Sequence, residues 1–306
     1  MINIKSKFLG GMVGSALGDA IGELTFRYRS QEALESQLET MKEFSYTDDS
    51  AMSIGIAESL VKKGDVDRRH LGEIFRRNFH KEPWRGYGPG PPAVFSMMER
   101  KGMSSTEAAK TLYGGQGSFG NGAAMRIVPV GLFFHNSPYI YYKACLSAEV
   151  THAHPVGKDG AAVQAKAVSL AVNLDCEEPF PGEKFIKALI DFARTAEMKD
   201  KMIQVQQLID AHQQPSLAIQ RLGRSVAVHE SLPFALYSFL RHPRSFEDCL
   251  FCATLNGGDR DTLGAMACAV SGAYVGIESV PLSWRNRLEN RSHIESLAVK
   301  LSEIKS

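Results

Sequence analysis

Four aspartates in two short segments are the residues of this 306-residue chain best suited to bind divalent cations. Asp48 and Asp49 follow Thr47 directly before a stretch with helical spacing, and Asp259 and Asp261 follow a Gly-Gly turn before another such stretch. Carboxylate and hydroxyl oxygens are the ligands that Mg²⁺, Mn²⁺ and Ca²⁺ prefer. Each pair, taken alone, is also typical of an ordinary N-terminal helix cap, because Asp and Thr stabilise the first turn.

The two segments together favour a metal site over two unrelated caps. If the helices that they begin converge, four carboxylates share one site, and such a cluster is unfavourable unless cations neutralise it. Two cations bridged by shared carboxylates would meet that requirement. An EF-hand is excluded, because the segment from Asp259 continues into a helix of small residues without the later acidic ligands.

A glycine-rich segment, residues 114–122, is the second feature that could bind a ligand. Part of it matches the GxGxxG pattern, but no buried strand precedes it and no βαβ unit surrounds it, so a Rossmann site is not indicated. We interpret the segment as a loop whose backbone N–H groups approach a pyrophosphate, with Phe119 available for stacking. The alternative is a flexible surface loop without a ligand.

Two histidines and two cysteines have spacings that are sometimes found in metal sites. His152 and His154 have no Cys or His cluster nearby, so zinc is not favoured, and we interpret them as a polar wall of a ligand site. Ordinary loop histidines are the alternative. Cys249 and Cys252 form a lone CxxC in an apolar stretch and are interpreted as packing residues, because a zinc site would need a second pair.

Helices must position these residues, because strand patterns are scarce in the sequence. Helical spacing is clearest over residues 50–62, 160–172 and 262–276, and the last two of these stretches carry small residues at intervals of three and four. Such stripes let helices approach closely, so both are predicted to be buried central helices. An amphipathic helix over 292–304 is predicted on the outside, and loops are predicted over 81–92 and 114–122. The simplest interpretation is one compact all-α domain over residues 1–306.

The composition excludes several classes of function. The formal charge of +1, from 35 basic and 34 acidic residues, gives no basic field for nucleic acid. No apolar run approaches the roughly 20 residues that span a bilayer. Residues 8–18 resemble a weak signal sequence, but they are rich in glycine and lead directly into Asp19. Five scattered cysteines suit a reducing compartment, so a cytoplasmic protein is expected. A monomer is expected as well.

Four segments, in this order, resemble the ADP-ribosylglycohydrolase family, the group related to the dinitrogenase-reductase-activating glycohydrolase. They span roughly residues 8 to 278, and their marks are residues 18–22 (GDAIG), 46–52 (YTDDSAM), 122–126 (GAAMR) and 257–262 (GGDRDT). Other stretches are similar to the ADP-ribosylhydrolase 3 branch, which removes ADP-ribose from serine and trims poly(ADP-ribose). These are residues 85–88 (RGYG), 117–122 (GSFGNG), 229–233 (HESLP) and 280–284 (VPLSW).

The resemblance implies an all-α, orthogonal helical fold with a two-metal centre at helix N-termini, usually holding Mg²⁺ or Mn²⁺. By matching positions, the implied metal ligands are Thr47, Asp48, Asp49, Asp259, Asp261 and Thr262. The residues implied to hold the diphosphate and distal ribose of ADP-ribose, or to line their pocket, are Gly117, Ser118, Phe119, Gly120, Asn121 and His152.

The chain departs from the family pattern at two positions. Arg260 stands between the two aspartates where the family usually has threonine, so its charge could alter cation affinity. Phe26 stands where the similar branch has a glutamate that serves as a metal ligand and gate, and the only nearby acid is Glu23. The second departure leaves open whether the chain has the full activity that the resemblance implies.

The implied reaction is hydrolysis of the C1″ glycosidic bond of ADP-ribose, through an oxocarbenium-like state. The implied substrates are ADP-ribosylated proteins, with serine favoured as the linkage, poly(ADP-ribose) and O-acetyl-ADP-ribose. Asp48 or Asp49 is expected to take a proton from a metal-bound water while the other binds the metal. Two alternatives are a catalytically weakened ADP-ribose-binding protein and a two-metal hydrolase of phosphate esters.

Overall fold

A computed structural model describes residues 2–304, and within this range it contains helices and no named strand. Two isolated β-bridges, Phe44 with Leu288 and Gly120 with Ala227, are the extended pairings found there. The α-helices are α1 (Ile4–Leu24), α2 (Gln31–Thr40), α3 (Asp48–Lys63), α4 (Arg68–Lys81), α5 (Gly90–Lys101), α6 (Ser105–Thr111), α7 (Val128–Phe133), α8 (Ile140–Ala148), α9 (Pro155–Val172), α10 (Gly182–Phe192), α11 (Ala196–Asp210), α12 (Pro215–Leu222), α13 (Val228–Arg241), α14 (Phe246–Leu255), α15 (Arg260–Val275), α16 (Leu282–Arg285) and α17 (Arg291–Ile304). Three short 3₁₀ turns complete the described elements: η1 (Tyr113–Gly115), η2 (Asn121–Ala123) and η3 (Ile277–Ser279).

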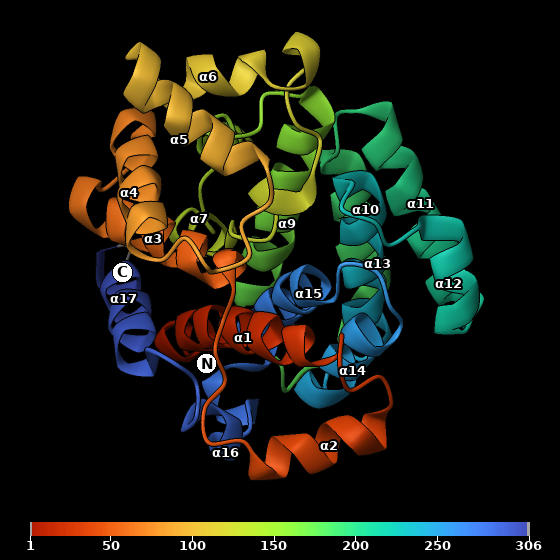
Figure 1. The fold of residues 1–306 in the computed structure, drawn as a ribbon. Helices are drawn as coiled ribbons and strands as arrows, with labels where there is room; N and C mark the ends of the chain where they lie inside the picture. The colour runs from red at the N-terminus through yellow and green to blue at the C-terminus, as the bar shows by residue number, and fades with distance from the viewer. Residues whose placement is uncertain (1, 305–306) are drawn as a thin grey trace.

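Helices α1 and α15 form the centre of the molecule and share its most extensive helix–helix contact (Figure 1). Glycines make the contact close: a methyl group added to Gly18 would overlap the backbone of Gly264, and one added to Gly10 would overlap that of Gly272. Since glycine has no Cβ, the two backbones approach further than other residues would allow. This packing brings Asp19, near the C-terminal end of α1, toward the start of α15, where Asp261 lies.

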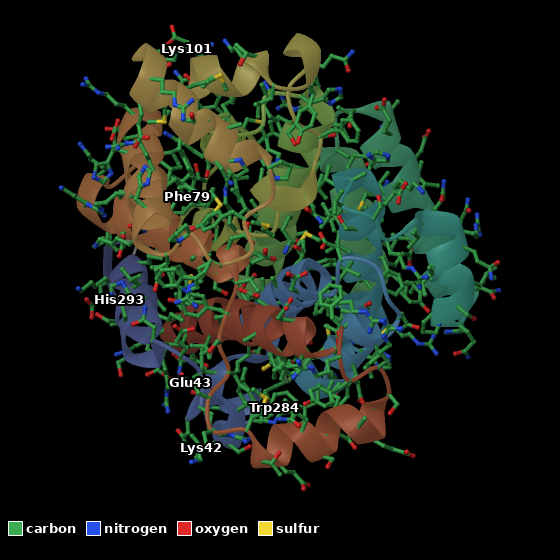
Figure 2. The ribbon with its side chains drawn as sticks, in the orientation of Figure 1. Lys42, Glu43, Phe79, Lys101, Trp284 and His293 are labelled. Carbon is green, nitrogen blue, oxygen red and sulfur yellow. The ribbon has the colours of Figure 1, made fainter. Side chains whose placement is uncertain are left out.

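The other helices surround this central pair. Helices α9, α13 and α14 pack on α15, while α17 packs on α1, α3 and α7 through one apolar face that includes Ile294, Leu297 and Leu301. Figure 1 shows α11 and α12 at the right edge and α2 and α16 at the bottom. In Figure 2, Lys42 and Lys101 point away from the body of the molecule, whereas Trp284 is buried and its ring faces that of Phe251.

The helices predicted from periodicity are confirmed, with ends that shift by a few residues. The stretches 50–62, 160–172, 262–276 and 292–304 correspond to α3, α9, α15 and α17. The predicted loop over 81–92 ends early, because α5 already begins at Gly90 and its prolines suit a first helical turn. The segment 114–122 is also not entirely a loop, since it overlaps the two short turns η1 and η2.

Two further predictions concern Cys249 and Cys252, which are interpreted as packing residues, and the apolar runs, which are too short to span a bilayer. Cys249 and Cys252 are buried on α14 with free thiols, as expected for packing residues. Cys145, Cys176 and Cys268 are free as well. Within residues 2–304, no helix combines the length and the apolar character that a membrane crossing requires.

Candidate active site

The two aspartate segments converge on one cavity of about 390 Å³. The N-terminal ends of α3 and α15 lie on its wall together with the loop that precedes α5 and the loop around η2. The predicted site residues that line the cavity are Asp48, Asp49, Ser118, Gly120, Asn121, His152, Asp259, Asp261 and Thr262. Three predicted residues, Thr47, Gly117 and Phe119, do not line it.

The first aspartate pair forms the first turn of α3. Thr47 is the N-cap of this helix and accepts a hydrogen bond from the N–H of Asp49 at 3.4 Å. Asp48 and Asp49 follow it and are both buried, at 8% and 2% exposure. The capping interpretation is therefore correct for Thr47, whereas Asp48 and Asp49 line the cavity. Thr47 donates its hydroxyl to Asp19 at 2.8 Å, which explains why it does not face the cavity.

Asp19 supports the site without lining the cavity, and the sequence showed it only within a motif of family resemblance. Its fully buried carboxylate accepts hydrogen bonds from the N–H groups of Thr47 and Ser50 and from both of their hydroxyls, at 2.6 to 3.1 Å. It thus attaches the start of α3 to α1. An acid placed among glycines and apolar residues of a helix was the available signal, because a buried charge is rare without hydrogen-bonding partners.

The second pair is held at the start of α15 by a glycine turn and by the glycine-rich loop. Gly258 has φ of 84° and packs against the backbone of Arg224, so no other residue fits there without strain. Asn121 donates its side-chain amide to Asp259 at 2.7 Å, and Asp261 accepts from the N–H of Thr262 at 2.9 Å. The Asn121 contact joins the loop predicted to bind diphosphate to the segment predicted to bind metal.

The acidic groups raise one another's pKa. Burial and the neighbouring Asp19 raise the pKa of Asp48 to about 7, and burial together with Asp259 and Asp19 raises that of Asp261 to about 8. The same two causes, burial first and Asp19 second, raise the pKa of Asp49 well above its usual range. One oxygen of Asp49 is buried without a hydrogen-bond partner. Cations in the cavity would neutralise this cluster and bind that oxygen.

The implied metal ligands Asp48, Asp49, Asp259, Asp261 and Thr262 line the same cavity, but their side chains are not arranged to coordinate a metal ion. Among residues 2–304, no three Asp, Glu, His or Cys side chains already lie in an arrangement that would hold a metal ion. Carboxylates would have to turn toward a cation, with threonine, water or substrate oxygens completing its coordination. The chemistry of the residues fits hard divalent cations, because all of the gathered groups offer oxygen ligands.

Arg126 is a second residue that the sequence analysis did not place in the site. Its side chain is fully buried at the cavity wall, with the guanidinium 4.7 Å from the centre of the Phe75 ring. It donates to the hydroxyl of Thr151 at 2.6 Å. Its positive charge partly offsets the effects that raise the pKa of Asp48. The sequence showed this arginine only within a motif of family resemblance.

The glycine-rich loop places some of its residues in the cavity and others outside. Ser118, Gly120 and Asn121 line the cavity, whereas Gly117, with φ of 75°, packs against Ala153 and His154. Phe119 is 44% exposed, and its ring centre lies 5.4 Å from that of His154 and 6.0 Å from that of His229. A ligand that stacks on Phe119 would therefore extend beyond the cavity.

The two histidines of the HAH segment have different roles. His152 is buried at the cavity wall, where burial and Arg126 lower its pKa to about 3, so its ring is neutral. Its Nδ1 lies 2.7 Å from the hydroxyl of Thr151. His154 is the N-cap of α9 and accepts from the N–H of Val156 at 3.2 Å. Only the first of them fits the polar-wall interpretation.

Both departures from the family pattern lie where α1 ends. Arg260 donates to the carbonyl oxygens of Thr25 at 2.9 Å and Thr254 at 3.2 Å, and its guanidinium lies 5.9 Å from the ring centre of Phe26. The guanidinium thus binds helix-end carbonyls. Phe26 is 43% exposed. Glu23 is on the last turn of α1, and its charge contributes to the raised pKa of Asp261.

A larger open groove of about 990 Å³ lies elsewhere, between α4, α5, α6 and α8. Three of its charged side chains pair with one another: Arg76 contacts Glu73 and Glu99, each at 2.9 Å. It contains none of the predicted site residues.

Comparison with known proteins adds independent findings. The model of the ADP-ribosylglycohydrolase family matches residues 1–305. The chain is 31% identical to the ADP-ribosylhydrolase ARH3 of Homo sapiens over 98% of this chain and 93% of that protein. It is 25% identical to the ADP-ribosyl-[dinitrogen reductase] glycohydrolase of Rhodospirillum rubrum over 94% and 92%. A solved structure of an ADP-ribosylglycohydrolase-related protein complex matches the fold with a TM-score of 0.71 at 23% identity, covering both chains completely.

Proposed function

Because the chain belongs to the ADP-ribosylglycohydrolase family and is an ADP-ribosyl hydrolase, we propose that it cleaves the C1″ glycosidic bond of ADP-ribose with two divalent cations, Mg²⁺ or Mn²⁺. The proposed substrates are ADP-ribose on protein side chains, with serine favoured, poly(ADP-ribose) and O-acetyl-ADP-ribose. The observation that carries the proposal is the convergence of Asp48, Asp49, Asp259 and Asp261 on one cavity that the glycine-rich loop also lines.

The cavity suits a small ligand with an anionic part and a sugar part. Its volume of about 390 Å³ is in the usual range of roughly 300–1,000 Å³ for ligand pockets. The hydroxyl of Ser118 accepts a hydrogen bond from the N–H of Gly120 and can donate its own proton to a diphosphate. Asn121 binds Asp259 and so connects that end of the cavity to the acidic end, where the C1″ carbon would lie.

Bound cations would orient the ribose hydroxyls and lower the pKa of a water molecule. The protein's own part is to hold that water and take its proton. Asp48 or Asp49 is the proposed base, since both carboxylates face the cavity at the first turn of α3. His152 is neutral and lies at the cavity wall, where its ring can donate or accept one hydrogen bond without adding charge.

Turnover of a serine-ADP-ribosylated peptide tests the proposal. We expect release of free ADP-ribose that depends on Mg²⁺ or Mn²⁺ and stops when EDTA is added. Asp48→Asn and Asp49→Asn should each abolish this release. Release of inorganic phosphate from a phosphate ester, with no release of ADP-ribose, would contradict it and identify a two-metal phosphoester hydrolase.

A catalytically weakened protein that mainly binds ADP-ribose is a second candidate, because Phe26 cannot serve as the metal-binding glutamate that the resemblance implies at this position. Isothermal titration with ADP-ribose, with and without Mg²⁺, separates it from the enzyme when combined with the turnover assay. Tight binding without hydrolysis at saturating Mg²⁺ would support the binding protein. Binding accompanied by hydrolysis would exclude it.

A further inference from the structure

The extended segment that leads into the first aspartate pair is held by residues from two distant parts of the chain. Phe44 pairs with the segment between α16 and α17: its N–H donates to the carbonyl of Arg287 at 2.7 Å, and its own carbonyl accepts from the N–H of Glu289 at 3.0 Å. These are backbone contacts and would form with many sequences. They bring the side chain of Glu289 beside Tyr46.

An ion pair then binds both backbone groups of Tyr46. The two terminal nitrogens of Arg85 donate to the two oxygens of Glu289 at 2.8 and 2.7 Å. Arg85 also donates to the carbonyl of Tyr46 at 2.9 Å, while Glu289 accepts from the N–H of Tyr46 at 3.3 Å. The guanidinium is buried and lies 4.2 Å from the centre of the Tyr46 ring. A two-pronged pair of this kind fixes orientation as well as distance.

The same arginine also contacts the chain on the other side of Thr47. The backbone carbonyl of Arg85 accepts a hydrogen bond from the N–H of Asp48 at 2.7 Å. This N–H belongs to the first turn of α3, so it has no partner inside the helix. Arg85 therefore holds Tyr46 through its side chain and Asp48 through its backbone. Neither Arg85 nor Glu289 lines the cavity.

We propose that Glu289 and Arg85 are positioning residues that set the direction in which Asp48 and Asp49 present their carboxylates. This proposal rests on the proposed function of those aspartates. It assigns a role in the active site to the segment before α17, although that segment is far from Asp48 and Asp49 in the sequence and contributes no ligand. Residues that orient metal ligands in this way typically change metal affinity by about 10- to 100-fold when they are lost.

The test compares three variants of the full chain. Glu289→Gln keeps the shape of the side chain but loses the charge that pairs with Arg85. Arg85→Lys keeps a positive charge but cannot hold Glu289 and Tyr46 together. Glu82→Gln is the matched control, because Glu82 also accepts two hydrogen bonds from Arg85, at 3.0 and 3.3 Å, but is more exposed and, unlike Glu289, does not accept the N–H of Tyr46.

The readouts are the dissociation constant for Mn²⁺ by isothermal titration, kcat and KM at saturating metal, and the dissociation constant for ADP-ribose. For Glu289→Gln and Arg85→Lys we expect Mn²⁺ affinity to fall by about ten-fold or more and kcat to fall with it. ADP-ribose affinity without metal should change less than two-fold, since the loop around η2 is not touched. Glu82→Gln should match the parent protein throughout.

Two outcomes would count against the idea in different ways. Wild-type Mn²⁺ affinity and kcat in a folded Glu289→Gln or Arg85→Lys variant, even with a lower melting temperature, would overturn the positioning role. Absence of Mn²⁺ binding in the parent protein would instead overturn the proposed metal site. Arg85→Lys decides the question if Glu289→Gln does not fold.

Discussion

Asp261 offers the most direct test of the metal site among single residues. Its carboxylate lies in the cavity at the start of α15 and accepts one hydrogen bond, from the N–H of Thr262. Asparagine can keep that bond but carries no charge. We expect Asp261→Asn to preserve the helical circular dichroism spectrum and to lower kcat by at least about 100-fold, as for other lost electrostatic groups in active sites. ADP-ribose release at the wild-type rate in saturating Mg²⁺ would refute this ligand.

Glu23 is the acid most able to compensate for Phe26, because its charge already acts on Asp261 from the last turn of α1. If it binds the second cation through a small movement, Glu23→Gln should lower activity about ten-fold, or about 1.4 kcal/mol of transition-state stabilisation. Phe26→Glu should then add little. Both variants are measured across a Mg²⁺ titration. A silent Glu23→Gln together with a more active Phe26→Glu would show that no acid substitutes.

Phe119 tests how far the ligand extends beyond the cavity. Its exposed ring faces His154 and His229, so removing it should cost little packing. Phe119→Ala should weaken ADP-ribose binding by about 1–3 kcal/mol if the ring stacks on the ligand, with little change in melting temperature. Tyr139→Ala, at another exposed ring, serves as the control. An unchanged dissociation constant with a large fall in melting temperature would make Phe119 a structural residue.

At the scale of helices, the glycine contacts between α1 and α15 decide how close the two halves of the acidic site lie. A methyl group at Gly264 would overlap the carbonyl of Gly18, and neither backbone can yield easily. We expect Gly264→Ala to destabilise the protein by about 1–3 kcal/mol or more and to weaken Mg²⁺ binding, because α15 carries Asp261. Urea unfolding and metal titration measure the two effects.

Gly182→Ala is the control for this prediction. Gly182 lies in the first turn of α10, its φ is not positive, and an added methyl group would meet only ordinary contacts with Phe180. It should leave stability unchanged or raise it by up to about 1 kcal/mol. Equal effects of the two substitutions would mean that the α1–α15 contact is not the cause.

Periodicity was sufficient to predict α9 and α15 as buried helices, but it did not indicate α1, the other helix at the centre of the molecule, or how these helices meet. The small residues of α9 and α15 recur at three- and four-residue intervals, which depends on local sequence alone. Convergence of Asp48 with Asp261 depends on α1, which packs against both helices and presents Asp19 to α3 and its glycines to α15. Helix α1 has apolar or small residues on all sides, so its sequence does not reveal which face meets which partner.

The same distinction applies to the supporting residues of the site. Asp48, Asp49, Asp259 and Asp261 could be found because paired acids before a helix are visible in the sequence. Glu289 could not, because a single glutamate in a charged segment resembles any surface residue until the fold brings it to Arg85. Long-range contacts of this kind are set by tertiary packing rather than by local pattern.

At the scale of the whole molecule, the acidic cavity should lower the stability of the metal-free protein as pH rises, whereas bound cations should raise it. In the metal-free folded protein the pKa of Asp48 is about 7 and that of Asp261 about 8, whereas both are near 4 in an unfolded chain. Between about pH 4 and pH 8 the folded state therefore binds more protons than the unfolded state. By linkage, the contribution of these groups to stability is present below about pH 4 and is lost as pH rises toward 8.

Metal-free protein should accordingly melt at a lower temperature at pH 8 than at pH 6, by about 1.6 °C for each kcal/mol lost in a chain of this size. Saturating Mg²⁺ should reduce or reverse this fall, because cations bind the ionised carboxylates and stabilise the folded state by about 2.7 kcal/mol at 100 times their dissociation constant. Differential scanning calorimetry at both pH values, with EDTA or Mg²⁺, gives the comparison. Asp261→Asn should show a smaller fall with pH and a smaller gain from Mg²⁺, because one titrating ligand is gone. Equal pH dependence in all of these conditions would mean that the cluster does not control stability and that cations do not neutralise it.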